Sequence, residues 1–187
     1  MKQELDALLC QKYPYMFQDR NGPIHKTCMC WGFAHGDGWF NILDMLCSGI
    51  QAHINWKRDS RARDLRFNRR LEKAIKHNDY RYLINPKISN NEYHVEECKH
   101  IFVTQEFRVP MEKVERVVVE QVKEKFGTLR FYYRGGDDVV SGMVQMAEML
   151  SAVTCEECGK PGKLRGGSWV KTTCEEHAPE NRDDESY

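Results

Sequence analysis

The chain has 187 residues, of which 41% are hydrophobic and 30% charged, and its 28 basic residues balance its 28 acidic ones. This composition provides one ordinary core, or a core with a small satellite module, and excludes a global field that would draw the protein onto nucleic acid or an anionic membrane. No apolar run reaches the roughly 18 residues that span a bilayer, and the first ten residues lack the apolar stretch of a secretory signal. We therefore expect a cytoplasmic protein.

Two segments in the N-terminal half show helical periodicity. Residues 2–11 predict a short helix with leucines on one side. Between residues 39 and 55, apolar side chains recur every three to four positions, which predicts a longer helix. Asp37 lies just before this segment and is placed to cap its N-terminus. Cys10 and Cys47 fall within these apolar stretches, which favours a role as small core residues.

Residues 57–81 form a strongly basic segment, with ten basic side chains against four acidic ones. A thin apolar stripe predicts a basic amphipathic helix over residues 61–78. Beyond it, Pro86 and its polar neighbours indicate a loop, and residues 100–107 predict a strand. We interpret residues 57–113 as an insertion into the fold.

Residues 114–134 contain two β-rich runs joined at Lys125-Phe126-Gly127, which is typical of a hairpin. A glycine pair ends the second run, and the two aspartates after it can cap a helix over residues 139–152. The expected buried face of that helix consists of Met143, Ala147 and Leu150. The pattern predicts an α+β fold in which a small antiparallel sheet packs on helices 39–55 and 139–152.

The C-terminal region carries a metal-binding pattern, Cys155-x2-Cys158-x15-Cys174-x2-His177. The first two cysteines supply two thiolates from one tight turn, and zinc prefers four sulfur or nitrogen ligands in a tetrahedron. The glycine-rich stretch between the two halves predicts a β-hairpin that turns at Gly166-Gly167. Together these features predict a treble-clef or zinc-ribbon module over residues 154–178 that binds Zn²⁺.

Four protein ligands close the coordination sphere of a zinc ion, whereas a catalytic zinc keeps one position open for water. Three thiolates also donate charge to the metal and weaken it as a Lewis acid. We therefore expect a structural zinc, with an iron–sulfur centre as the weaker alternative because histidine ligation is uncommon there.

Two other groups of histidines and cysteines leave a second metal site open. Neither spacing matches a standard closed module, and histidines are common in polar loops. The groups are His25, Cys28 and Cys30, with His35 nearby, and His94, Cys98 and His100.

The basic segment suggests contact with phosphates, because basic side chains on one helix face neutralise the nucleic-acid backbone. A solvated helix face is the simpler explanation, and the neutral net charge favours it. The nucleic-acid hypothesis assigns the contacts to Arg66, Arg69, Arg70 and Lys73.

The turn before the second helix places His35 and Asp37 close to Trp39, which suits a small-ligand or nucleotide pocket, or an acid–base pair. A capping aspartate with a loop histidine is the simpler explanation. The sequence contains no nucleotide-binding glycine loop, nucleophile elbow or HExxH motif. We therefore assign no catalytic residues and favour a binding protein over an enzyme.

Three stretches together resemble a family of small proteins of tailed bacteriophages and prophages with a C-terminal zinc-knuckle module. They are residues 36–47 (GDGWFNILDMLC), residues 120–133 (EQVKEKFGTLRFYY) and the zinc segment ending in TTCEEHA. The resemblance covers about half of the chain and has no counterpart for residues 57–113. It implies a fold and a setting inside an infected bacterium, and no established activity.

These observations predict three parts: an α+β core over 1–153 with the basic insertion, the zinc module over 154–178, and an acidic tail over 179–187. The leading hypothesis is a phage accessory protein that acts by binding a host or phage macromolecule, with a protein as the favoured partner and host takeover or inhibition of host defence as candidate roles. Nucleic-acid binding and a small-ligand site are the alternatives. The sequence leaves the partner and the oligomeric state open.

Overall fold

The computed structural model describes residues 1–25, 27–88, 90–166 and 169–178. Of the residues that the structure describes, 51% are helical and 17% lie in strands, which confirms an α+β fold. It divides into two compact units: unit 1 comprises Met1–Ile54 and Val114–Tyr187, and unit 2 comprises Asn55–Lys113. The predicted acidic tail at 179–187 lies outside the described residues.

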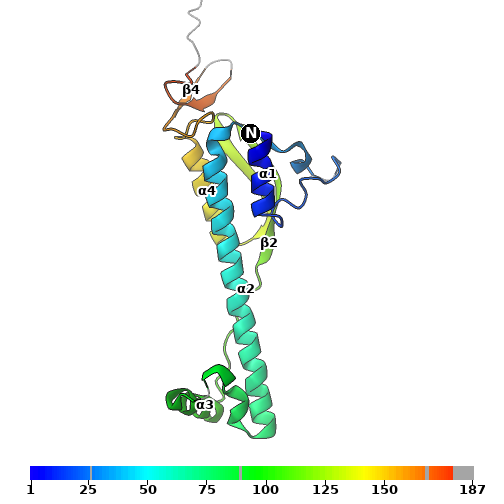
Figure 1. Ribbon diagram of the computed structural model, residues 1–187, viewed down its shortest axis with the longest axis vertical. Helices are drawn as coiled ribbons and strands as arrows, with labels where there is room; N and C mark the ends of the chain where they lie inside the picture. Colours follow the sequence, from blue (N-terminus) through cyan, green and yellow to red (C-terminus); the bar gives the residue numbers. More distant parts are fainter. Residues whose placement is uncertain (26, 89, 167–168, 179–187) are drawn as a thin grey trace, which may run out of the picture. The chain divides into compact units, whose positions relative to one another are not determined.

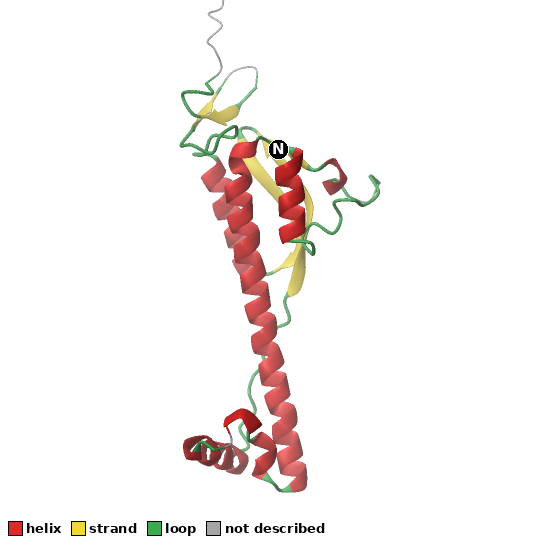
Figure 2. Cartoon of the chain, in the orientation of Figure 1, coloured by secondary structure: helices red, strands yellow, loops and turns green. Residues whose placement is uncertain are grey.

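Unit 1 contains the sheet that the predicted hairpin provides. β2 (Glu115–Lys125) and β3 (Thr128–Gly136) pair antiparallel, and the short β1 (Phe33–Ala34) pairs parallel to β2. Helix α1 (Gln3–Lys12), the first part of α2 (Phe40–His77) and α4 (Asp138–Ser151) accompany this sheet (Figures 1 and 2). The helix at the N-terminus and the hairpin are confirmed.

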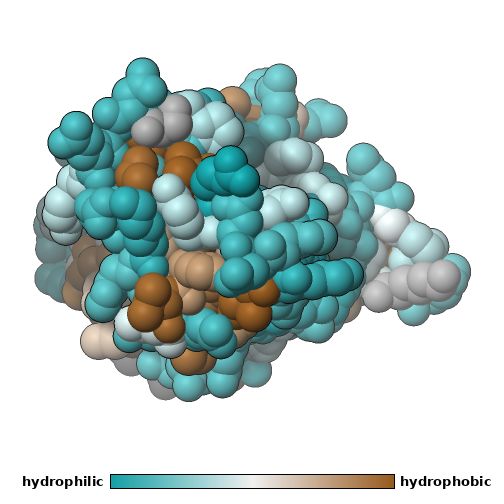
Figure 3. Space-filling view, turned by 90° about the horizontal axis from the view of Figure 1, so that it is seen from below, coloured by the Kyte–Doolittle hydropathy of each residue, from teal (hydrophilic) through white to brown (hydrophobic). Residues whose placement is uncertain are grey.

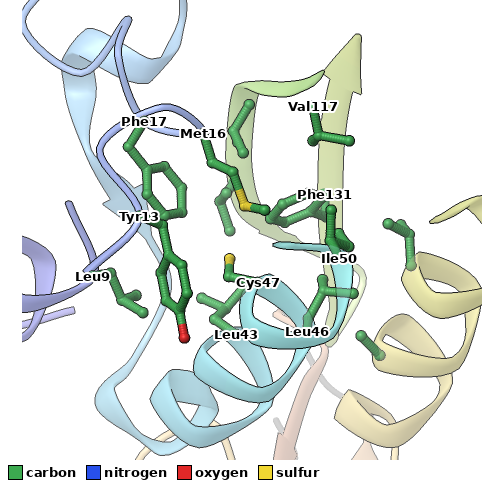
Figure 4. Packing of buried hydrophobic residues seen from close by; sticks show 14 of the residues in the cluster. Leu9, Tyr13, Met16, Phe17, Leu43, Leu46, Cys47, Ile50, Val117 and Phe131 are labelled. Atoms are coloured by element: carbon green, nitrogen blue, oxygen red, sulfur yellow. The ribbon is translucent and has the colours of Figure 1, made fainter. Parts of the chain in front are cut away.

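One apolar cluster joins these helices to the sheet (Figure 4). Cys47 is buried within it, as predicted, whereas Cys10 is half-buried with its thiol 3.4 Å from the Asp6 carboxylate. The members with no exposed surface include Leu9, Leu43, Ile50, Val119 and Leu129. Each helix of unit 1 therefore gains its stability by burying one apolar face against the hairpin.

α4 begins at a side-chain cap, because the Asp137 carboxylate accepts a hydrogen bond from the Val140 N–H at 3.2 Å. Its buried face consists of Val140, Val144, Ala147 and Ser151. The predicted burial of Ala147 is confirmed, but Leu150 is 49% exposed. The buried face of α4 is therefore shifted by about one residue toward the C-terminus relative to the predicted face, with Val144 and Ser151 in place of Met143 and Leu150.

α2 is one continuous helix from Phe40 to His77, and it contributes residues to both units. The predicted division into helices 39–55 and 61–78 is therefore wrong. Residues 50–77 contain neither proline nor glycine, so nothing in the backbone chemistry ends the helix between the two periodic stretches.

Unit 2 closes around the end of α2 with two short 3₁₀ turns, Tyr80–Leu83 and Pro86–Ile88, and helix α3 (Glu92–Thr104). The strand predicted at 100–107 is wrong. Asn91 caps the N-terminus of α3. The apolar residues of α3 recur at helical spacing and pack into a small second core. That core contains Phe67, Leu71, Ala74, Leu83 and Cys98.

The two units differ in charge. Residues 55–113 carry 14 lysines and arginines against 9 aspartates and glutamates, and the rest of the chain carries 14 against 19. Unit 2 is therefore basic, although the net charge of the whole chain is zero. In the view of Figure 3, hydrophilic side chains cover most of the visible face and hydrophobic ones form separate patches.

Candidate functional site

The four predicted metal ligands converge at the C-terminal end of unit 1. Cys155 and Cys158 follow α4, and a two-stranded hairpin, β4 (Lys163–Arg165) with β5 (Lys171–Thr173), leads to Cys174 and His177. The hairpin is confirmed, although Gly167 of its predicted turn lies outside the described residues. Cys155 and Cys174 are buried, and Cys158 and His177 are exposed.

The ligand atoms fit a tetrahedral metal ion. All four lie within 4.8 Å of one another. The distance is 3.7 Å from Cys155 Sγ to His177 Nδ1, 3.7 Å from Cys158 Sγ to Cys174 Sγ, and 3.2 Å from Cys174 Sγ to His177 Nδ1. A tetrahedron with Zn–S bonds of about 2.3 Å and a Zn–N bond of about 2.0 Å has edges of about 3.5–3.8 Å. Two of the three distances match these edges, so the cluster could bind a metal ion.

The surroundings of Cys155 favour the thiolate that a metal requires. Burial raises the pKa of its thiol, but backbone N–H groups of Cys174, Cys158 and Glu157 donate to the sulfur and lower the pKa to about 6. The backbone thus stabilises a negative charge on this sulfur.

Residues 154–159, which contain the first two cysteines and which we call the cysteine knuckle, pack closely on the turn that precedes α2. The Gly38 N–H donates to the Glu156 carbonyl oxygen at 2.7 Å, and the Trp39 indole N–H donates to the Thr154 carbonyl oxygen at 2.9 Å. A Cβ on Gly38 would overlap the Cys155 carbonyl oxygen. Only a glycine therefore allows the two backbones to approach this closely.

The three residues of the predicted small-ligand pocket, His35, Asp37 and Trp39, have structural roles in this turn. Trp39 is fully buried, and His35 is 7% exposed with burial lowering its pKa to about 4. Asp37 does not cap α2 as expected, because its carboxylate accepts from the Lys2 backbone N–H at 2.7 Å and pairs with the Lys2 amine at 2.9 Å. The three side chains thus hold the turn against its neighbours.

A second metal site receives no support within the described residues, where the C-terminal cluster is the only convergence of three or more such ligands. His94 and Cys98 do approach each other, with His94 Nε2 at 3.7 Å from Cys98 Sγ. However, the same nitrogen accepts the Asn85 N–H at 3.1 Å, and His100 does not join the pair.

Unit 2 contains a hollow of about 470 Å³ whose lining consists of arginines, and we call it the arginine hollow. It combines three of the four predicted phosphate ligands with two further arginines that the sequence did not single out. Lys73 is exposed one turn further along α2 and does not line it. The lining residues are Arg63, Arg66, Arg69, Arg70 and Arg108.

Arg108 is held in the hollow from a distant part of the sequence. Asn68 accepts the Arg108 backbone N–H at 2.9 Å and donates to the Arg108 carbonyl oxygen at 2.8 Å. The Arg108 guanidinium stacks 3.9 Å above the Phe67 ring and lies 3.7 Å from the Asp64 carboxylate. Since only the folded chain brings these residues together, local sequence patterns contain no signal for Arg108.

The other four arginines of the hollow form no ion pair with any described residue. Arg66 lies three residues from Arg63 and from Arg69 and four residues from Arg70, and these helical spacings bring its charge close to each of theirs. Charged groups concentrated in this way attract multivalent anions.

Comparison with protein families, with curated proteins and with solved structures finds no match to this chain. Among the described residues, no helix combines the length and apolar character needed to cross a membrane.

Proposed function

We propose that the chain is a binding protein that contacts nucleic-acid phosphates through the arginine hollow and that uses zinc structurally in unit 1. The observation that carries this proposal is the set of four arginines that line one hollow without an ion pair among the described residues.

The arrangement of the hollow supports an anionic ligand. Like charges three or four residues apart on a helix destabilise it by about 0.2–0.5 kcal/mol per pair, so the stripe costs stability unless an anion neutralises it. Guanidinium groups also present paired donors that match phosphate oxygens. Because Asn68 and Phe67 already hold Arg108 in place, binding would not have to order this side chain, and the entropy cost of binding would be smaller.

The metal is proposed to be Zn²⁺ on the basis of its ligands. Three cysteine sulfurs and one histidine nitrogen form a donor set typical of structural zinc, and four protein ligands leave no position for a substrate. The knuckle contacts the turn before α2, so metal binding would stabilise unit 1 as a whole.

Fluorescence anisotropy with labelled single-stranded and duplex oligonucleotides tests the nucleic-acid proposal. Arg66→Gln/Arg70→Gln should weaken binding to both about tenfold or more and reduce the slope of log K against log salt by about 0.7–0.9 for each phosphate that the variant no longer neutralises. The matched control, Lys76→Gln/Lys87→Gln, removes the same charge from unit 2 outside the hollow. Equally weakened binding in both double variants, or no binding by the wild type at low salt, would refute the proposal.

A protein partner is the second candidate, and an apolar groove in unit 1 favours it. The groove of about 580 Å³ is lined by Ile42, Met45, Leu46 and Gly49 of α2 and by Gly142, Met143, Met146, Ala147 and Leu150 of α4. Met45 and Met146 are 75% and 63% exposed, and flexible methionines adapt well to a helix laid into a groove. We call it the methionine groove.

The side chains that line the methionine groove indicate the chemistry of its occupant. All are apolar or glycine. The acids of the two helices are engaged elsewhere: Asp44 pairs with the Lys12 amine at 2.6 Å. Glu148 accepts the Phe131 N–H at 3.0 Å. An amphipathic helix that buries an apolar face fits this surface best, and in the phage setting it would belong to a host or phage protein. A synthetic amphipathic peptide should bind the wild type and fail to bind Met146→Lys. If light scattering instead shows a dimer that Met146→Lys separates, the occupant is a second copy.

A further inference from the structure

The tip of the β2–β3 hairpin has an unusual residue at its first position. Lys125 pairs with Thr128, so the turn contains two residues, and both have positive φ: 54° at Phe126 and 76° at Gly127. Such turns strongly favour asparagine or aspartate followed by glycine, because a bulky side chain is disfavoured in the left-handed region. Phe126 therefore occupies a position where an aromatic residue costs stability.

Burial does not compensate for this cost. Phe126 is 71% exposed, and Trp169, which lies between β4 and β5, is 68% exposed. Both line a hollow of about 420 Å³ in unit 1, together with Glu124, Lys125 and Val170. Two large aromatic side chains thus face solvent around one hollow, which an aromatic ligand could fill.

The turn between β2 and β3 is held against the β4–β5 hairpin. The Thr172 hydroxyl donates to the Gly127 carbonyl oxygen at 2.6 Å in a buried position, and the Gly127 N–H donates to Glu124 Oε1 at 2.6 Å. A Cβ on Gly127 would overlap the Leu164 side chain. Phe126 is therefore displayed by a turn that has little freedom to move.

Two charged side chains line the hollow: Glu124 already accepts the Gly127 N–H at 2.6 Å, and Lys125 remains to contact an anionic ligand. The Lys125 amine lies 5.4 Å from the centre of the Phe126 ring and forms no ion pair with any described residue. A base that stacks on an aromatic side chain brings its own phosphate, which a nearby lysine can neutralise.

We propose that Phe126 and Trp169 stack an unpaired base of single-stranded nucleic acid, with Lys125 contacting the adjacent phosphate. This inference rests on the proposed function and specifies its ligand as a single strand. Duplex bases are already stacked and cannot enter the hollow, whereas any base of a single strand offers a planar face.

Phe126→Asn provides a sharp test, because asparagine suits the left-handed turn and removes only the aromatic ring. Its melting temperature should equal or exceed that of the wild type, while its affinity for a thymidine oligonucleotide should fall about 5- to 150-fold. Trp169→Ala should lower the affinity similarly, and affinity for a duplex should not change in either variant. Trp31→Ala, which removes another tryptophan that is 67% exposed, serves as the control.

The outcomes separate this inference from the proposal on which it rests. If Phe126→Asn binds the single strand as well as the wild type, or if it melts at a lower temperature, the stacking site is refuted while the arginine hollow stands. If Arg66→Gln/Arg70→Gln keeps full affinity and Phe126→Asn does not, the arginine hollow is refuted and the stacking site stands. Binding of an aromatic-rich peptide that Phe126→Asn abolishes, with no oligonucleotide binding, would assign the site to a protein partner and overturn the inference.

Discussion

Two glycine-to-alanine substitutions test how the cysteine knuckle and the turn that precedes α2 support each other. In Gly38→Ala, the new Cβ meets three backbone groups of the knuckle: the Cys155 carbonyl oxygen, the Gly159 nitrogen, and the Glu156 carbonyl oxygen at 2.7 Å. None of these atoms can rotate away, so the turn must separate from the knuckle. Gly142→Ala is the matched control, because a Cβ there meets nothing within 4 Å in an exposed position of α4.

The expected effects have opposite signs. Separation of the turn would break the hydrogen bonds from Gly38 to Glu156 and from Trp39 to Thr154, each contributing about 1 kcal/mol. Overpacking adds about 1–3 kcal/mol, so we expect Gly38→Ala to lower the free energy of unfolding by about 3–5 kcal/mol. Gly142→Ala should raise it by about 0.5–1 kcal/mol, because alanine has the higher helix propensity.

Urea unfolding followed by far-UV circular dichroism measures both changes, and a colorimetric chelator assay measures the metal retained. Gly38→Ala should also release metal more readily than the wild type, since the turn no longer supports the knuckle. A Gly38→Ala variant as stable as Gly142→Ala would refute the close docking of the two segments.

Three further predictions concern the metal, a buried histidine and the support of the arginine hollow. Chelation or Cys174→Ser should remove one equivalent of zinc and lower the melting temperature of unit 1, and an unchanged melting temperature would show that the metal is dispensable. The pKa of His35 is lowered to about 4 by burial, so the unfolded state takes up the proton first as the pH falls below 6.5. Stability should therefore decrease by about 3 kcal/mol between pH 6.5 and 4 through this group, and the decrease should be smaller in His35→Gln when both are compared by urea titration. Asn68→Ala should release the Arg108 segment and weaken oligonucleotide binding severalfold with α2 intact, whereas unchanged binding would exclude Arg108 from the site.

Local patterns predicted the parts of the fold that depend on local chemistry. The ligand spacing around Cys155 and Cys174 identified the cysteine–histidine cluster that could bind a metal ion, and two β-rich runs around Gly127 identified the hairpin. The helix after the glycine pair also followed from its aspartate cap.

Other parts depend on contacts between distant residues, which no local pattern contains. The β-branched residues of 100–107 favour a strand in isolation, but Cys98, Ile101 and Phe102 pack at helical spacing into the core of unit 2, and this tertiary packing stabilises helix α3 instead. Likewise, the sequence suggests a ligand pocket at His35 and Trp39 because it does not show that the cysteine knuckle packs against this turn. In the structure, the Trp39 indole N–H donates to the Thr154 carbonyl oxygen. Arg108 is 38 residues or more from the other arginines in sequence, so only the fold assigns it to the arginine hollow.

The most direct test of the central claim is the affinity of the zinc-loaded protein for a single-stranded oligonucleotide, measured across a salt series for the wild type and Arg66→Gln/Arg70→Gln. If the arginine hollow binds phosphates, the double variant should bind about tenfold or more weakly and show a shallower salt dependence, with zinc content and melting temperature maintained. Identical affinities and slopes in the two proteins would contradict the claim.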